Sequence, residues 1–189
     1  MATTVTERHV ELLDEAVELF LAEGFAGFTL SDLAARLRCS KTTLYALGRT
    51  KEQLTAGVVR HFFRRATAFV EQRTAAHDDP AERIVAYLRA VADALRPASP
   101  RFMADLAEHA AAAEVYEQNT AAAAARVRRL IAEGVDGGEF RAVHAAFVAD
   151  TVAATMTRIQ DGTVLRTTGL HDADAYEELA ALVLGGVRR

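Results

Sequence analysis

Three side chains that can donate hydrogen bonds stand together at the predicted start of a short helix: Lys41, Thr42 and Thr43. Side chains at the beginning of a helix reach deepest into the major groove of duplex DNA, where a lysine can donate to the acceptors of guanine. Lys41 and Thr42 are therefore predicted to contact base edges, and Thr43 to hold a phosphate. We expect the partner of this segment to be double-stranded DNA.

The charge around these residues supports that expectation. Five Lys or Arg residues and no Asp or Glu lie between Arg36 and Lys51, although the whole chain has a net charge of −4. Local positive charge of this kind favours binding to phosphates. A basic helical hairpin that faces solvent and binds no DNA is the alternative interpretation, because such hairpins also occur in proteins that bind no DNA.

Two short helices joined by a tight turn are predicted to position these side chains. Thr29 can cap the first helix, with Asp32 near its positive end, and Ser40 can cap the second. Leu44 is expected to point back into the core, and one buried face of the first helix follows helical spacing through Leu30, Leu33, Ala34 and Leu37. This is the spacing of a helix-turn-helix, whose second helix enters a major groove.

The flanking residues carry a family resemblance. The segments 12–20, 23–29, 40–45 and 51–52 together resemble the N-terminal domain of the TetR-like transcriptional repressors, with a specific match from about Val10 to Val58 and a likeness of length and helical layout beyond it. The resemblance implies a homodimer with a three-helix DNA-binding domain. It also implies a larger helical domain that binds a small molecule and releases the DNA.

The resemblance adds Tyr45 as a phosphate contact, although a half-buried aromatic ring that closes the small domain is the alternative. Lys51, near the start of the next helix, is also expected to contact phosphate. The complete set of expected DNA-binding residues is Thr29, Ser31, Ser40, Lys41, Thr42, Thr43, Tyr45 and Lys51.

The chain departs from the family pattern in the turn and after the second helix. Arg38 stands where the family usually has a glycine with positive φ, at a cost of roughly 1 kcal/mol. Leu47 and Gly48 replace residues that are usually aromatic, and Gly48 is expected to end the helix. Cys39 could be a redox switch beside Arg38 and Lys41, but a small apolar residue in the turn is the ordinary explanation.

The fold is predicted to be all-α, with about nine helices. Residues 1–50 are expected to form the helix-turn-helix domain, and residues 51–189 the helical ligand-binding and dimerisation domain. Helices are expected over residues 6–23, 30–37, 41–47, 51–76, 80–95, from 100 to a break within the alanine run 110–113, 114–133, 143–160 and 173–187, with a loop at Gly134, Gly137 and Gly138.

The last two helices carry long apolar stripes that suit a two-fold, four-helix dimer interface. Alternatively, both stripes face the core of their own chain. The residues concerned are Val148, Val152, Thr155, Ile159, Tyr176, Leu179, Ala180, Val183, Leu184 and Val187.

The region in which the family's ligand cavity forms supplies apolar walls and few polar groups, which is typical of a small-molecule site. A small apolar or aromatic effector is therefore expected, although plain core packing explains any one of these residues equally well. The candidates are Phe62, Phe69, Tyr87, Phe102, Met103, Leu106, His109, Tyr116, Asn119, Met156 and Gln160.

Composition and residue spacing argue against membrane-spanning, secreted, metal-binding and enzymatic proteins. The chain has 189 residues, 51% of them hydrophobic, with no apolar run long enough to span a membrane and no signal-peptide pattern. With a single cysteine, a cytoplasmic location is expected. The six histidines show no metal-ligand spacing, and no nucleophile elbow, phosphate loop or paired carboxylates are present, so we expect no metal, no cofactor and no enzymatic activity.

The sequence thus predicts a homodimeric DNA-binding regulator, a repressor released from a palindromic operator by its effector. The alternative is a small helical ligand-binding protein or enzyme with an incidental helix-turn-helix, and a helical structural adaptor is a third possibility.

Overall fold

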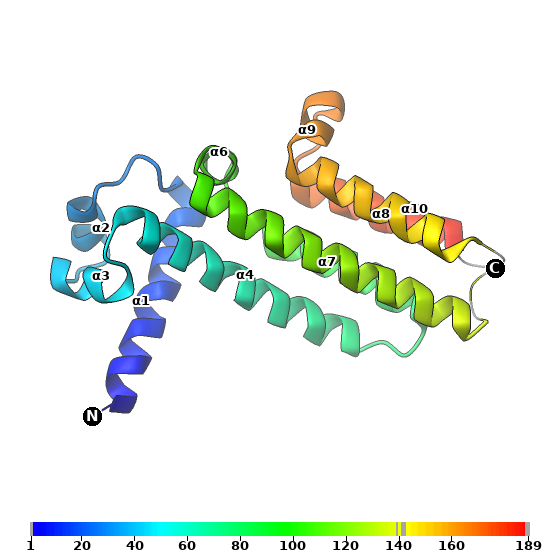
Figure 1. Ribbon diagram of the computed structural model, residues 1–189, viewed down its shortest axis with the longest axis horizontal. Coiled ribbons are helices and arrows are strands. Elements are labelled where there is room, and N and C mark those ends of the chain that lie inside the picture. Colours follow the sequence, from blue (N-terminus) through cyan, green and yellow to red (C-terminus); the bar gives the residue numbers. More distant parts are fainter. Residues whose placement is uncertain (1, 139, 141–142, 188–189) are drawn as a thin grey trace. The chain divides into compact units, whose positions relative to one another are not determined.

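The computed structural model describes residues 2–138, 140 and 143–187, which form ten α-helices and no strand (Figure 1). The helices are α1 (Ala2–Glu23), α2 (Leu30–Arg36), α3 (Lys41–Leu47), α4 (Lys51–Ala75), α5 (Pro80–Leu95), α6 (Pro100–Glu108), α7 (Ala110–Asp136), α8 (Ala145–Gln160), α9 (Thr163–Thr168) and α10 (Asp172–Val187). The predicted all-α class is confirmed. The unexpected helix is α9, which buries no residue and therefore lacks the apolar stripe by which a helix is recognised.

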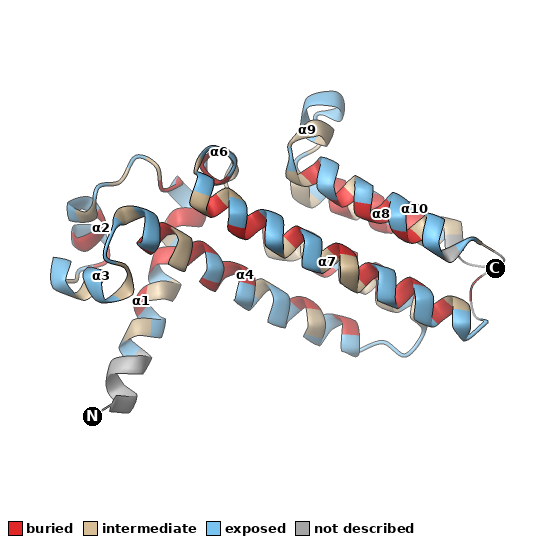
Figure 2. Ribbon diagram, in the orientation of Figure 1, coloured by how far each residue is buried: buried red, intermediate tan, exposed pale blue. Residues whose placement is uncertain are grey.

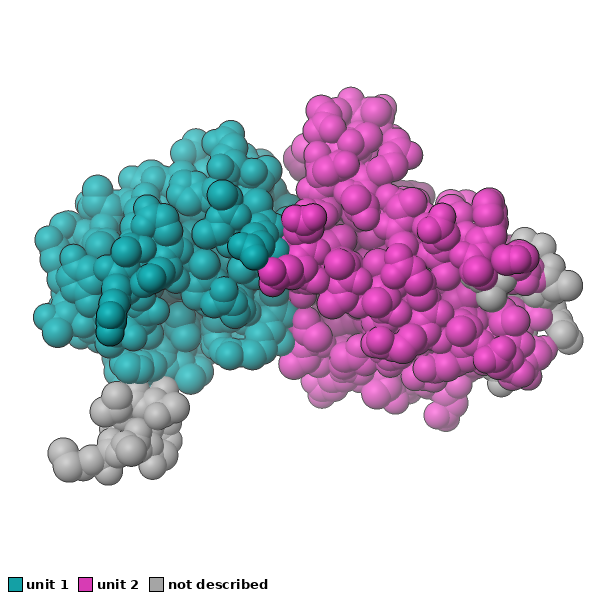
Figure 3. Space-filling view, in the orientation of Figure 1, with its two compact units in different colours: residues 1–65, 97–116 teal, residues 66–96, 117–189 magenta. Residues whose placement is uncertain are grey.

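The chain divides into two compact units (Figure 3). Unit 1 comprises Met1–Arg65 and Pro97–Tyr116, and unit 2 comprises Ala66–Arg96 and Glu117–Arg189. This division differs from the domain boundary expected at residue 50, because the first part of α4, the whole of α6 and the start of α7 group with the N-terminal helices.

Local capping signals define the helix-turn-helix within unit 1. Gly24, at φ +75°, ends α1, a backbone conformation that favours glycine. Thr29 and Asp32 form a capping box at the start of α2, and the Ser40 side chain accepts a hydrogen bond from the Thr43 N–H at the start of α3. These helices therefore begin where the sequence predicted. In contrast, α1 begins at Ala2, four residues before the start that was expected from the sequence.

Aromatic rings form the core of unit 1. Phe25, from the turn between α1 and α2, packs against Phe20 at 5.2 Å between ring centroids and edge-on against Phe102 of α6 at 6.0 Å. Phe62 of α4 lies edge-on to Phe102 at 5.8 Å. The ends of α1, α4 and α6 are therefore joined by one apolar cluster, which anchors the turn that precedes α2.

In unit 2, α10 packs against α5 and α8. Asp79 caps α5, with Pro80 in its first turn, as the sequence predicted. Ile84, Leu88 and Ala92 of α5 have no exposed surface, and they contribute an apolar face to the core of the unit.

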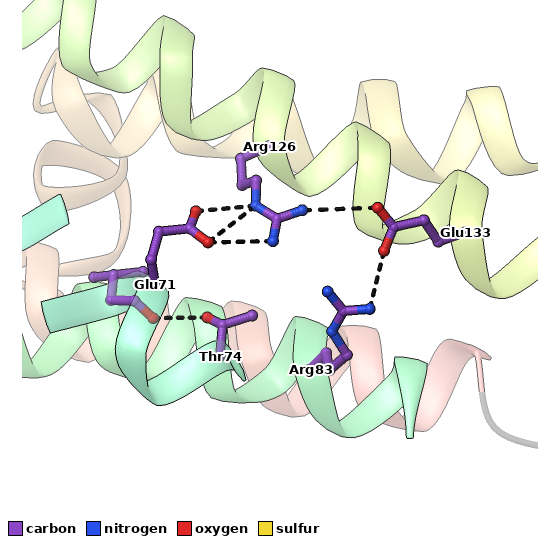
Figure 4. A network of polar contacts seen from close by, with 6 residues as sticks. Glu71, Thr74, Arg83, Arg126 and Glu133 are labelled. Carbon is purple, nitrogen blue, oxygen red and sulfur yellow. Dashed lines mark hydrogen bonds and ion pairs between the residues drawn. The ribbon is translucent and has the colours of Figure 1, made fainter. Parts of the chain in front are cut away.

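A charged network joins α4, α5 and α7 within unit 2 (Figure 4). The guanidinium of Arg126 donates to both carboxylate oxygens of Glu71, at 2.9 and 3.2 Å, and also pairs with Glu133 at 3.8 Å. Arg83 donates to the other oxygen of Glu133 at 3.0 Å. The Arg126 side chain is only 18% exposed, so its pairing with Glu71 is better shielded from water than an ordinary surface ion pair.

Two predicted helix ends are wrong. The helix that contains Phe102 breaks at His109, before the alanine run, because His109 takes an extended backbone and its ring packs edge-on against Phe25 at 5.4 Å. The next helix, α7, therefore starts at Ala110 and continues through Gly134 to Asp136. Gly134 therefore lies inside α7 and not in a loop, and the ring of Phe140 packs over it where a Cβ atom would collide.

No helix in the described part of the chain is long and apolar enough to cross a membrane. Nor do the described residues bring three histidine, cysteine or acidic side chains together in a way that could hold a metal ion.

Candidate DNA-binding interface

The first turn of α3 presents the side chains that were expected to read bases. Lys41 and Thr42 are exposed, and most of α3 faces solvent (Figure 2). Ser40 and Thr43 are already engaged: the Ser40 oxygen accepts from the Thr43 N–H at 3.0 Å, and the two hydroxyls lie 2.8 Å apart. Lys41 and Thr42 are therefore the side chains of this turn that are free to reach a groove, while Ser40 and Thr43 hold the helix start.

Thr29 and Ser31 lie at the start of α2, and both are exposed. The Thr29 hydroxyl donates to Asp32 at 2.7 Å and accepts from its N–H at 3.2 Å. The hydrogen bonds that the carboxylate accepts, first from the Thr29 hydroxyl and then from the Thr29 N–H at 2.8 Å, hold the pKa of Asp32 below its usual value. Asp32 therefore remains ionised near the start of α2. Because the Thr29 hydroxyl is engaged with Asp32, the hydroxyl of Ser31 is the one that is free to bind a phosphate.

Tyr45 is 48% exposed, so its ring does not belong to the buried core of the small domain. Leu44 has that role, with 1% of its surface exposed. The exposed phenol is compatible with the expected phosphate contact.

Lys51 lies differently from expectation. Its ammonium group donates a hydrogen bond to the backbone oxygen of Ala26 at 2.7 Å, in the turn between α1 and α2. The side chain is half-buried against that turn, while Lys41 extends freely. Lys51 therefore holds the reading domain together, whatever it contributes to phosphate binding.

The turn between α2 and α3 departs from the family as the sequence indicated. Arg38 has φ +48°, which is the left-handed conformation that a glycine adopts without strain. Burial raises the pKa of the Cys39 thiol, although the nearby Arg8 acts in the opposite direction. A raised pKa lowers the thiolate fraction that oxidation requires, so the structure favours Cys39 as a small apolar residue of the turn.

The positive charge near α3 is only partly neutralised. Arg36 pairs with Glu23 and lies over the ring of Phe28, at 5.6 Å from its centroid. Among the described residues, no carboxylate pairs with Arg38, Lys41 or Arg49. These three cations remain available to phosphates.

An open groove of about 570 Å³ lies beside the turn between α2 and α3 in unit 1, and no sequence pattern predicted it. It is lined by Arg8, Glu15, Glu18, Leu19, Arg36, Leu37 and Arg38. Arg8 is paired with Glu11 at 3.1 Å and Glu15 at 3.4 Å, so the α1 side of the groove is not a strongly cationic surface.

The expected ligand-contact residues fall in both units. Phe62, Phe102, Met103, Leu106, His109 and Tyr116 lie in unit 1, and Phe69, Tyr87, Asn119, Met156 and Gln160 lie in unit 2. Leu106 and Met156 have no exposed surface, and Phe102 has 1%, so these three side chains are core residues in this conformation and line no open cavity. Met103, His109, Asn119 and Gln160 retain accessible surface, and Phe69 is 38% exposed.

Six of the residues assigned to a dimer interface are covered by their own chain: Val152, Ile159, Tyr176, Leu179, Ala180 and Val183. In the single chain these six side chains pack into the core of unit 2, which is the alternative that the sequence left open for the two stripes. Val148, Thr155 and Leu184 are half-buried, and the side chain of Val187 lies outside the described residues. The large apolar side chains exposed on α8 and α10 are Phe147 (71%) and Leu182 (72%).

One site residue was missed entirely by sequence reasoning. Asp105 of α6 is 2% exposed and accepts hydrogen bonds from the N–H groups of Phe25 and Ala26, at 2.5 and 2.8 Å. These partners are about eighty residues away in the chain, and no local pattern connects them.

Comparison with known proteins agrees with this geometry. Residues 12–58 match the family described as "Bacterial regulatory proteins, tetR family". No curated protein matches the chain at a comparable level of significance.

Solved structures with the same fold cover nearly the whole chain. A TetR/AcrR-family transcriptional regulator from Thermobifida fusca is 23% identical, with a TM-score of 0.67 over 97% of this chain and 100% of the other. The fatty acid degradation regulator FadR from Bacillus halodurans is 15% identical, with a TM-score of 0.67 over 94% and 98%. RolR in complex with its ligand resorcinol is 19% identical, with a TM-score of 0.60 over 100% and 91%.

The capped helix pair and the exposed basic start of α3 define a DNA-binding transcriptional regulator of the helix-turn-helix class. Residues 12–58 match the tetR family of bacterial regulatory proteins, the family that the sequence resemblance indicated.

Proposed function

We propose that this regulator is a homodimeric repressor that binds an imperfect palindromic operator, one α3 per half-site, and that a small apolar or aromatic effector releases it. The observation that carries the DNA part is the exposure of Lys41 and Thr42 at the start of a helix already capped by Ser40. The alternative, a ligand-binding protein or enzyme with an incidental helix-turn-helix, gives no reason for unpaired cations at this place.

The two-fold arrangement follows from the helix-turn-helix. A single reading helix contacts only a few base pairs, and dimers of such domains bind half-sites about one helical turn apart. The exposed side chains of Phe147 and Leu182 supply apolar surface that a second copy could cover.

The effector part is supported by the descriptions of two similar solved structures. RolR is in complex with resorcinol, and FadR is described as a regulator of fatty acid degradation. In this chain, we propose that an apolar or aromatic molecule binds among the helices of unit 2, with polar anchors such as Asn119 and Gln160. Its binding releases DNA only to the extent that it favours the conformation that binds DNA poorly.

Selection from random duplex DNA tests the DNA part. The protein should enrich a sequence with two related half-sites, and titration of that sequence at fixed salt should give specific binding well above that of scrambled DNA. Failure to enrich any sequence at low salt would exclude the proposed function.

A thermal-shift screen followed by DNA titration tests the effector part. A ligand at a hundredfold excess over its dissociation constant adds about 2.7 kcal/mol to the stability of the folded state. Aromatic and amphipathic metabolites should raise the melting temperature and then weaken the DNA complex. If only highly charged compounds such as nucleotides stabilise the protein, or if stabilising compounds leave the DNA complex intact, the apolar-effector proposal is wrong.

A further inference from the structure

We propose that Asp105 is a positioning residue of the DNA-binding domain: its carboxylate, supplied by α6, holds the turn from which α2 and α3 are presented to DNA. The inference rests on the proposed DNA-binding function and assigns a role to a residue that lies outside the helix-turn-helix itself. It is argued entirely from contacts inside unit 1.

One carboxylate oxygen of Asp105 satisfies two backbone donors. Oδ2 accepts from the Phe25 N–H at 2.5 Å and from the Ala26 N–H at 2.8 Å. Oδ1 lies 3.2 Å from Nε of Arg101, whose side chain is 64% exposed. Asp105 is only 2% exposed and Phe25 is 1% exposed, so the Phe25 N–H has no bulk water to replace the carboxylate, while the Ala26 N–H is part-buried.

Gly24 leaves the room that the carboxylate occupies. A Cβ atom added at Gly24 would lie 2.5 Å from Oδ2 of Asp105 and 2.6 Å from Cγ of Arg101. Its φ of +75° also turns the chain out of α1 and aims the next two N–H groups toward α6. Gly24 and Asp105 are therefore complementary, although the sequence separates them widely.

Other groups from α4 and the α6 region hold the same turn. The N–H of Ser99 donates to the Leu21 oxygen at 2.8 Å, and Lys51 donates to the Ala26 oxygen at 2.7 Å. The rings of Phe102 and His109 enclose Phe25. Within this arrangement, Asp105 is the group that accepts from the buried N–H of Phe25 and the part-buried N–H of Ala26.

The position of the turn determines the position of the reading helix. Only Gly27, Phe28 and Thr29 separate Ala26 from the first residue of α2, and α3 packs directly on α2. Without the carboxylate, the turn can adopt other conformations, and only the fraction of molecules with the correct turn binds the operator. The apparent dissociation constant rises as that fraction falls.

Three variants separate the hydrogen bonds from the charge. In Asp105→Asn, the amide oxygen can take the place of Oδ2 and accept from both N–H groups, so the operator affinity should stay within about threefold of wild type. Asp105→Ala removes the acceptor and should weaken operator binding about tenfold or more. Arg101→Ala is the matched control, because it removes the exposed cation beside Oδ1 while Oδ2 and its two N–H donors stay in place, so the affinity should stay within about threefold of wild type.

Amide hydrogen exchange provides the readout that overall destabilisation does not reproduce. In Asp105→Ala, the amides of Phe25 and Ala26 and those of α2 and α3 should exchange faster, while the amides of α5 and α10 in unit 2 keep their wild-type rates. The affinity is measured at a temperature at which circular dichroism shows the variant folded. If Asp105→Ala is unfolded there, Gly24→Ala replaces it, because its Cβ displaces the carboxylate while Asp105 remains, and the same loss is expected.

The two proposals fail in different ways. Wild-type operator affinity in Asp105→Ala, or an equal loss in Asp105→Asn, overturns the positioning role. Unchanged exchange at Phe25 and Ala26 in Asp105→Ala also overturns it, and this measurement needs no DNA. If the wild-type protein itself selects no DNA sequence, the proposed function fails, whatever the exchange experiment shows.

Discussion

The ammonium group of Lys51 donates to the backbone oxygen of Ala26 at 2.7 Å, which ties the start of α4 to the turn that precedes α2. A lysine engaged in this way stabilises the DNA-binding domain through the turn between α1 and α2. From its position at the start of a helix, Lys51 was expected to contact phosphate. The hydrogen bond to Ala26 gives the same cation a structural role.

Lys51→Ala should therefore weaken binding to operator and random DNA alike without changing the salt dependence. A phosphate contact contributes roughly one unit to the slope of log K against log salt. Arg60→Ala, an exposed position further along α4, is the control for lost positive charge. A slope reduced by about one unit in Lys51→Ala alone would restore the phosphate role.

Lys41→Ala should reduce operator affinity by about 1–3 kcal/mol while leaving binding to scrambled DNA nearly unchanged, since a base contact discriminates among sequences. The exposed, unpaired side chain of Lys41 leaves no structural role whose loss could imitate this effect. Titrations at one salt concentration, with Arg60→Ala as the control, measure the two affinities. An equal loss on both DNAs would contradict base reading.

Arg38→Gly should stabilise the protein by about 0.5–1 kcal/mol, because glycine adopts φ +48° without the cost that a side chain imposes there. The greater freedom of glycine in the unfolded chain offsets part of the gain. Arg38→Ala removes the same charge but keeps a Cβ atom, so it should show no such increase in urea unfolding. Equal stability of the two variants would mean that the turn carries no strain.

Tyr87 should make the protein less stable at alkaline pH. Burial, with a smaller contribution from Glu71, raises the pKa of Tyr87 to about 12 from its usual value near 10. Above pH 10, the unfolded chain loses this proton while the folded chain keeps it, so the free energy of unfolding falls as the pH rises toward 12.

The loss attributable to Tyr87 is on the order of 1–2 kcal/mol. In urea unfolding at several pH values from 9 to 12, Tyr87→Phe should show a shallower decline than wild type. Tyr45→Phe, at a position 48% exposed, should keep the wild-type decline. Parallel curves for wild type and Tyr87→Phe would show that the phenol ionises equally in both states.

The features that the sequence predicted correctly are those determined by neighbouring residues. Thr29, Ser40 and the pairs Asp79-Pro80 and Ser99-Pro100 begin helices where expected, because a cap depends on groups within about three residues. The features that were missed depend on contacts across the fold. Gly134 lies within α7 and leaves room for the ring of Phe140, and Asp105 reaches a turn that no sequence pattern links to α6.

The apolar stripes of the last two predicted helices also show that local sequence patterns do not reveal contacts across the fold. Helical spacing reveals that Val152, Ile159 and Tyr176 face one side, but not whether that side meets its own chain or a second one. In the structure these residues belong to the core of unit 2. A dimer surface on these helices can therefore use the half-buried stripe residues Val148, Thr155 and Leu184. It can also use exposed residues off the stripe, such as Phe147 and Leu182, which spacing alone did not single out.

Phe147→Glu combined with Leu182→Glu should convert the dimer to a monomer without unfolding it. Both side chains are more than 70% exposed in the single chain, so a carboxylate at either position remains hydrated until a second copy covers it, at a cost of several kcal/mol for each unpaired charge that becomes buried. Light scattering should show half the wild-type mass at an unchanged melting temperature of unit 2. Leu165→Glu on α9, at a position 38% exposed, is the control and should remain dimeric. Val183→Glu should instead unfold unit 2, because that side chain is 6% exposed within its own chain. A double variant that keeps the wild-type mass would place the interface away from α8 and α10.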